Sequence, residues 1–240
     1  MPSPSSPRAS DVAASSALRL VDSGSFTHYL RGARVGEERF VIREERTGGE
    51  GTLLLAAAEV NRKIDGETSR IRVALEAIGT GPLPVRYEVA IQGSDARTIV
   101  AVLVRDRLRL NVRSSVGHEM RQFLVQGSAI ILDRHMAHQY FFASRVLGEE
   151  ETAETTVFVP QNQNQAQAVI RDLGLEDVAI EGESYRLRHL SISADEIGTQ
   201  HAWLDGETVV RVEVPREEWS AVRSDLSTLS VEEKGESPNE

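Results

Sequence analysis

The residues that come closest to a catalytic or metal-binding arrangement are Asp133, His135 and His138, spaced D-x-H-x-x-H. On a helix, positions three apart lie roughly on one side, so both imidazoles would face the same space. The sequence offers no third metal ligand that matches them, and histidines on a helix more often face water or border a pocket. We therefore expect no metal site, and an enzyme that uses His135, His138 and nearby carboxylates is the least favoured function.

Other sequence motifs of catalysis are incomplete or absent. The segment His118-Glu119-Met120-Arg121-Gln122 begins like the zinc-protease motif H-E-x-x-H but ends in glutamine and lies in strand-like sequence. There is no G-x-S-x-G elbow, no P-loop and no G-x-G-x-x-G. Cysteine is absent, which excludes disulfides, thiolate zinc sites and thiol nucleophiles. We predict no catalytic residue and no cofactor.

The charge of the chain restricts its partners. With 27 basic and 37 acidic residues in 240, the net charge is −10, which argues against a nucleic-acid partner. One strip is basic, however, and could face an anionic partner such as a lipid head group or an acidic protein; the plainer interpretation is a solvated strand face. The strip comprises Arg97, Arg105, Arg107, Arg109, Arg113 and Arg121. No apolar run approaches the roughly 18–20 residues of a transmembrane helix.

The elements that would position these side chains are mainly strands. In residues 70–77 the apolar side chains Ile71, Val73, Leu75 and Ala77 alternate with polar ones, and residues 85–92 show the same period of two. Such alternation is typical of half-buried strands. Turn sequences such as Asp65-Gly66 separate the alternating segments, which favours antiparallel meanders over parallel crossovers.

One segment predicts a helix instead. Residues 134–147 carry apolar side chains on one helical stripe, with Asp133 as a candidate N-cap and Gly148 as a stop. A single such helix within a long meander fits best across the concave side of a curved sheet. A short terminal helix over residues 216–223 would follow Pro215.

These patterns predict an all-β fold with one or two helices: an open or partly closed antiparallel β-barrel, or half-barrel, wrapped around a helix. Residues 1–23 are rich in Ser, Ala and Pro and predict a disordered arm. Residues 24–226 form the single barrel-like domain, and residues 227–240 form a disordered acidic tail.

Several landmarks resemble those of uncharacterised bacterial envelope proteins. They are Gly32-x-x-x-Gly36-x-Glu38-x-Phe40, Ile131-Leu132-Asp133 before an aromatic helix, and Trp203-Leu204-Asp205 followed by residues 209–215. The chain is similar to the group that shares the fold of the periplasmic lipoprotein carriers, an unclosed barrel around helices with an apolar cavity. The resemblance implies a periplasmic or other extracytoplasmic location and binding of acyl chains or lipoproteins. The sequence shows no signal-peptide pattern, which leaves a cytoplasmic location open.

The function that we expect is a non-enzymatic binding or carrier protein of the bacterial envelope with an apolar groove for an acyl chain, lipid or lipoprotein. The alternative is a structural or interaction module of the envelope, in which the helix plugs the sheet and no small ligand binds. The candidate ligand-contacting residues are Tyr87, Phe123, Met136, Tyr140, Phe141 and Trp203.

Overall fold

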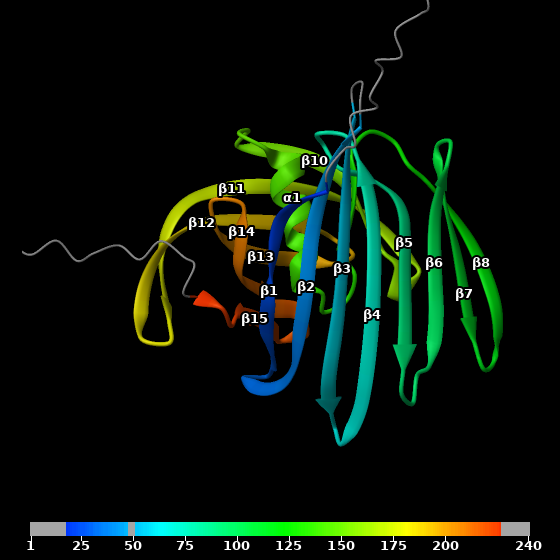
Figure 1. The fold of residues 1–240 in the computed structure, drawn as a ribbon, viewed down its shortest axis with the longest axis horizontal. Helices are drawn as coiled ribbons and strands as arrows, with labels where there is room; N and C mark the ends of the chain where they lie inside the picture. Colours follow the sequence, from blue (N-terminus) through cyan, green and yellow to red (C-terminus); the bar gives the residue numbers. More distant parts are fainter. Residues whose placement is uncertain (1–17, 48–50, 227–240) are drawn as a thin grey trace, which may run out of the picture.

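The computed structural model describes residues 18–47 and 51–226, and in this part of the chain fifteen strands form one continuous sheet (Figure 1). The first eight are β1 (Arg19–Leu30), β2 (Ala33–Thr47), β3 (Gly51–Ile64), β4 (Glu67–Ile78), β5 (Leu83–Gln92), β6 (Arg97–Val104), β7 (Arg107–Ser114) and β8 (Gly117–Leu124). The others are β9 (Ala129–Ile131), β10 (Thr152–Val159), β11 (Asn164–Ile180), β12 (Glu183–Ala194), β13 (Gly198–Asp205), β14 (Thr208–Val214) and β15 (Trp219–Arg223).

The strand order shows that the sheet is two meanders joined at their ends. It runs β8-β7-β6-β5-β4-β3-β2-β1-β15-β14-β13-β12-β11-β10-β9, so the first and last strands pair in the middle. Neighbours are antiparallel except β9 and β10, which are parallel. Strands β8 and β9 are the two edges, and they are not paired with each other.

The sheet is curled because its two edges are joined by a short link. Residues 125–128 connect β8 to β9, and a chain extends at most about 3.3–3.6 Å per residue. The opposite edges of the sheet must therefore lie close together in space, and β9 also contacts β5. The result is an open, mostly antiparallel barrel, as the alternating pattern predicted (Figure 1).

The alternation predicted from the sequence fixes which side of each strand faces inward. In β4, Ile71, Val73, Leu75 and Ala77 are buried, whereas most of the residues between them are exposed. Burying apolar side chains on the concave face is the main stabilising contribution to such a fold. A smaller apolar cluster that includes Trp203 lies on the opposite face, because Trp203 alternates with the inward-facing Ala202 and Leu204.

Helix α1 (Tyr140–Leu147) lies inside the curve of the sheet, as expected (Figure 1). Its burial exceeds the single stripe that was predicted, because Phe141, Phe142 and Ala143 are buried along with Tyr140 and Leu147. The predicted start at residue 134 and the predicted cap at Asp133 are wrong. The helical segment begins with a 3₁₀ turn at Ala137–Gln139, whose N-cap position is Met136.

The predicted terminal helix over residues 216–223 is also wrong. A 3₁₀ turn at Pro215–Glu217 is followed by Glu218 with a left-handed φ of 50°, and then by β15. Residues 19–23, which the sequence assigned to a disordered arm, belong to β1 and pair with β2. Residues 1–17 of that arm and the acidic tail of residues 227–240 lie outside the described residues.

Candidate functional site

Two adjoining cavities lie at one end of the barrel and share Arg134 and Asn162 in their linings. The first cavity has a volume of about 380 Å³, and its lining includes Asp133, His135, Tyr140, Gln200 and Glu217. The second has a volume of about 430 Å³, and its lining includes Arg62, Ser69, Arg97 and Gln161. Both linings are dominated by charged, amide and hydroxyl side chains.

His135 lies between the two cavities and contacts residues of both. Its backbone is in the left-handed region (φ 59°), and its ring stacks on the Trp219 indole with centroids 5.1 Å apart. Arg62 Nη1 lies 3.2 Å from His135 Nδ1. Because a guanidinium can only donate, Nδ1 must accept, and the ring is neutral with its proton on Nε2. Burial, more than any neighbouring charge, lowers the pKa of His135, which agrees with the neutral form.

Glu217 is the carboxylate of this network. Its Oε2 lies 2.8 Å from His135 Nε2, in a contact that is close but not aligned as a regular hydrogen bond. The same oxygen accepts a hydrogen bond of 2.9 Å from Arg134 Nε. His135, and after it Arg134, lower the pKa of Glu217 to about 2 against the opposing effect of burial. Glu217 is therefore ionised at neutral pH.

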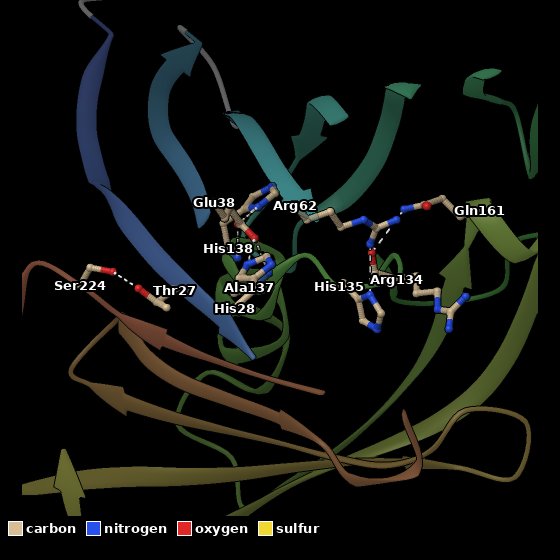
Figure 2. Close-up of polar contacts among 10 residues, drawn as sticks. All are labelled: Thr27, His28, Glu38, Arg62, Arg134, His135, Ala137, His138, Gln161 and Ser224. Carbon is tan, nitrogen blue, oxygen red and sulfur yellow. Dashed lines mark hydrogen bonds and ion pairs between the residues drawn. The ribbon is translucent and has the colours of Figure 1, made fainter. Parts of the chain in front are cut away.

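Arg62 is a partly buried cation of this region that forms no hydrogen bond with a carboxylate in the described part of the chain. Its Nε donates to Ser69 Oγ over 3.0 Å, and Nη1 reaches His135. Within the described ranges, Arg62 forms no ion pair with a carboxylate. Burial, together with the positive charges of Arg134 and Arg97, lowers the pKa of Arg62. Figure 2 shows Arg62 extending toward His135, Arg134 and Gln161.

A second network fixes the loop that leads into the helix. Asp133 is buried and accepts hydrogen bonds from the Tyr87 hydroxyl (2.7 Å) and from the backbone N–H groups of Arg134 (3.0 Å) and Gln161 (2.9 Å). Its own backbone N–H donates to Gln139 Oε1. Asp133 thus ties β5, the helical segment and the turn after β10 together, instead of capping the helix.

The third network is centred on Glu38 of β2, which is fully buried. Its Oε1 accepts from the backbone N–H of His138 (2.9 Å) and lies 2.6 Å from His138 Nδ1. Its Oε2 accepts from the Ala137 N–H (2.9 Å) and lies 3.1 Å from His28 Nε2. Burial alone raises the pKa of Glu38, but His138 and then His28 outweigh burial and hold it well below its usual range.

Glu38 therefore supplies the cap that the sequence assigned to Asp133. The first N–H groups of a helical segment have no partner within it, and a carboxylate is the acceptor best suited to them. This network lines neither of the two cavities, and Figure 2 shows it apart from the group around Arg62 and His135. We assign it a structural role: it anchors the start of the helical segment to the sheet.

The histidines that the sequence grouped together are separated by these networks. His138 contacts Glu38, whereas His135 contacts Arg62 and Glu217. His135 precedes the helical segment, so the two rings do not share a helical face. Among the described residues no group of three or more potential ligands is placed to hold a metal ion.

The predicted ligand-contacting residues are divided between several environments. Tyr87, Met136 and Phe141 are buried in the core, and Phe123 is partly buried against Phe158, with centroids 5.8 Å apart. Tyr140 is buried but lines the first cavity, and its hydroxyl donates to Gln200 Oε1 over 2.6 Å. Trp203 is on the opposite face of the sheet and donates from Nε1 to Glu176.

The basic strip is largely a solvated surface. Arg105, Arg107, Arg109, Arg113 and Arg121 are exposed, in agreement with the plainer interpretation of the sequence. Arg97 differs, because it lines the second cavity and its buried Nε has no hydrogen-bond partner. Sequence reasoning missed Arg62, Arg134, Gln200 and Glu217, which come together from separate strands and turns.

Comparisons with known proteins add little to this description. No family model and no curated protein matches the chain. A solved structure of a β-barrel-like protein of domain of unknown function DUF1849 from Brucella abortus is 9% identical, with a TM-score of 0.48, and the match covers 84% of this chain and 93% of that one. A DUF1089 family protein from Pseudomonas aeruginosa is 10% identical, with a TM-score of 0.43, over 69% and 90% of the two chains.

No helix in the described part of the chain is both long and apolar enough to cross a membrane.

Proposed function

We propose that this chain is a non-enzymatic binding protein that takes a small polar ligand in the two cavities at the end of its barrel. The observation that carries the proposal is the contrast between these cavities and the barrel interior. Helix α1 and the inward-facing strand residues fill the interior, and Tyr140, Phe141 and Phe142 are each at most 3% exposed. The cavities at the end are open, and arginine, amide and carboxylate side chains line them.

The arrangement favours binding over catalysis. The most deeply buried carboxylate, Glu38, is saturated by two backbone N–H groups and two imidazoles, and it lines neither cavity. His135 is held between Arg62 and Glu217: its Nδ1 accepts from Arg62, and its Nε2 lies 2.8 Å from the Glu217 carboxylate. Among the described residues, neither Glu38 nor His135 is hydrogen-bonded to a hydroxyl group whose proton it could take, as general-base catalysis requires.

Ligand-observed nuclear magnetic resonance tests the proposal with defined probes: inorganic phosphate, acetate, glycine and glycerol. Asn162 is exposed and borders both cavities, so Asn162→Phe should obstruct both with little effect on the core. Gln122→Phe, at an exposed position on β8, is the matched control. We expect at least one polar probe to bind the unmodified protein and the control, and to bind Asn162→Phe about tenfold more weakly.

A second candidate is the acyl-chain or lipoprotein carrier of the bacterial envelope that the family resemblance implies. One observation favours it: a shallow hollow of about 460 Å³ over β2, β3 and β4, whose lining includes Phe40, Val41, Ala57, Ala58 and Val73 beside Arg39, Glu59 and Arg72. Saturable binding of the non-ionic probe monooctanoylglycerol, unaffected by Asn162→Phe, would support this candidate. If no probe of either kind binds, the chain is an interaction module with a helix-filled sheet.

A further inference from the structure

The second cavity presents three guanidinium groups whose charges are unevenly compensated. Arg134 is paired with Glu217, and Arg97 Nη2 lies 3.4 Å from Asp95 Oδ2, a long contact in which the Asp95 side chain is 74% exposed. Arg62 has no such partner within the described residues. A charge that is withdrawn from water without a partner destabilises the fold, so this position favours the arrival of an anion.

Among the described residues, the acidic side chains of the same lining form no ion pair with Arg62. Asp65, Glu67 and Asp95 are all exposed, which places them at the rim. Glu67 accepts a hydrogen bond from the Ser94 hydroxyl, which also lines the cavity. The carboxylates therefore border the entrance, whereas the partly buried Arg62 and Arg97 lie further in.

The contacts of Arg62 also orient its guanidinium. Its Nε donates to Ser69 Oγ, and Nη1 donates to the neutral His135 ring, so two contacts on different sides of the group hold its plane. Ser69 Oγ accepts from Arg62, which leaves the hydroxyl proton of Ser69 able to donate to a ligand. A guanidinium held in this way offers its remaining N–H groups in the planar geometry that suits an oxyanion.

We infer that the second cavity is a binding site for a phosphate group, held by Arg62 and Arg97 with support from Arg134 and Ser69. This inference rests on the proposed function and names the ligand class for it. Two neighbouring arginines that lack full counter-charges suit the doubly charged phosphate better than a single carboxylate. The phosphate has two conceivable sources, a small soluble phosphate ester or the head group of a lipid, and the same chemistry recognises both.

The test is isothermal titration of the full chain with inorganic phosphate, at an ionic strength held constant with sodium chloride. Arg62→Gln should weaken binding at least about tenfold, and Arg97→Gln should weaken it by a smaller factor. Arg113→Gln, which removes an exposed arginine that lines neither cavity, should leave the affinity unchanged. If Arg62→Gln does not fold, the affinity of Arg97→Gln for phosphate decides the test. This variant should fold, because Arg97 loses only one long ion pair.

Two further titrations identify the source of the phosphate. Glycerol 3-phosphate represents a soluble ester, and dihexanoyl phosphatidic acid below its micelle concentration represents a lipid head group. An affinity at least about tenfold higher for the lipid analogue assigns a lipid, and equal affinities assign a soluble phosphate. Phosphate binding that is absent, or equal in all variants, overturns the inference. In that case the proposed function would still stand if glycine or glycerol binds and Asn162→Phe weakens that binding. If neither probe binds in this way, both the inference and the proposed function are wrong.

Discussion

Arg62 Nη1 lies 3.2 Å from His135 Nδ1, and this contact joins the linings of the two cavities. Arg62 comes from β3, whereas His135 comes from the loop between β9 and the helical segment. The contact requires a neutral imidazole, because a protonated ring has no acceptor to offer. The contact between Arg62 and His135 therefore depends on the protonation state of His135.

The first prediction concerns pH. Because burial lowers the pKa of His135 below its unfolded value of 6.5, the unfolded chain binds a proton more readily than the folded chain. The contribution of His135 to stability is complete above pH 6.5 and is lost as the pH falls through the folded pKa. Arg62 and Arg134 stay charged, and Glu217, with a pKa of about 2, stays ionised over this range. Urea unfolding from pH 8 to pH 5 measures the slope.

The matched variant for this measurement is His135→Asn. Asparagine tolerates the left-handed backbone at this position, and its side-chain oxygen can still accept from Arg62. We expect its stability to fall less between pH 6.5 and pH 5 than that of the unmodified protein, with a slope difference of at most about 1.4 kcal/mol per pH unit. Identical pH profiles for the two proteins would show that His135 does not titrate in this way.

The second prediction concerns Glu38. Glu38→Gln removes a buried charge and places an amide N–H₂ against donors, so we expect a loss of about 3–5 kcal/mol in the free energy of unfolding. Glu37→Gln is the control, because Glu37 forms an exposed pair with Arg39 and should lose less than about 0.5 kcal/mol. Equal effects of the two substitutions would remove Glu38 from its anchoring role.

The third prediction concerns the buried cation Arg223, which is 2% exposed. Asp22 accepts from it at both carboxylate oxygens, over 3.0 Å and 2.9 Å. Asp22→Asn should cost about 1.5–3 kcal/mol, the range for a hydrogen bond to a charged group. Asp177→Asn, at the exposed pair with Arg186, should cost under about 0.5 kcal/mol. If Asp22→Asn leaves the free energy of unfolding unchanged, β1 contributes little to stability at its Asp22 end.

The fourth prediction separates a filled interior from an open groove. Tyr140 is 3% exposed and packs within the main core, so Tyr140→Ala should cost about 3–5 kcal/mol. Tyr140→Phe keeps the ring and removes the hydrogen bond to Gln200, so it should cost about 0.5–1.5 kcal/mol. A loss below about 2 kcal/mol for Tyr140→Ala would instead indicate a partly empty interior, as an acyl-chain carrier requires.

Much of the fold could be predicted because the side-chain period of a strand is a local property. Ile71 and Val73 are buried where the alternation placed them, and the helix lies in the concave side as expected. The helix predicted over residues 216–223 rested on their position after Pro215, and the period of two in the residues that follow was overlooked. Trp219 and Ala221 are buried at a period of two, which was readable as a strand.

The candidate site could not be predicted because its contacts join distant parts of the chain. Glu38 bonds to the His138 N–H across 100 residues, and Arg62 bonds to His135 across 73. Asp133 was the nearer acceptor, and local spacing favoured it as the cap. The register of the sheet places Glu38 against the first N–H groups of the helical segment. No local pattern in the sequence specifies that register over such separations.

The most direct measurement of whether the ligand binds at the polar end of the barrel is Trp219 fluorescence. Trp219 stacks on His135, and Trp203 is the second of the two tryptophans. Trp203→Phe therefore leaves Trp219 as the single reporter. We predict a saturable change in its emission on titration with inorganic phosphate, strongly reduced when Asn162→Phe is added, and no change with monooctanoylglycerol. A response to the acyl probe alone, or to neither probe, would contradict the account.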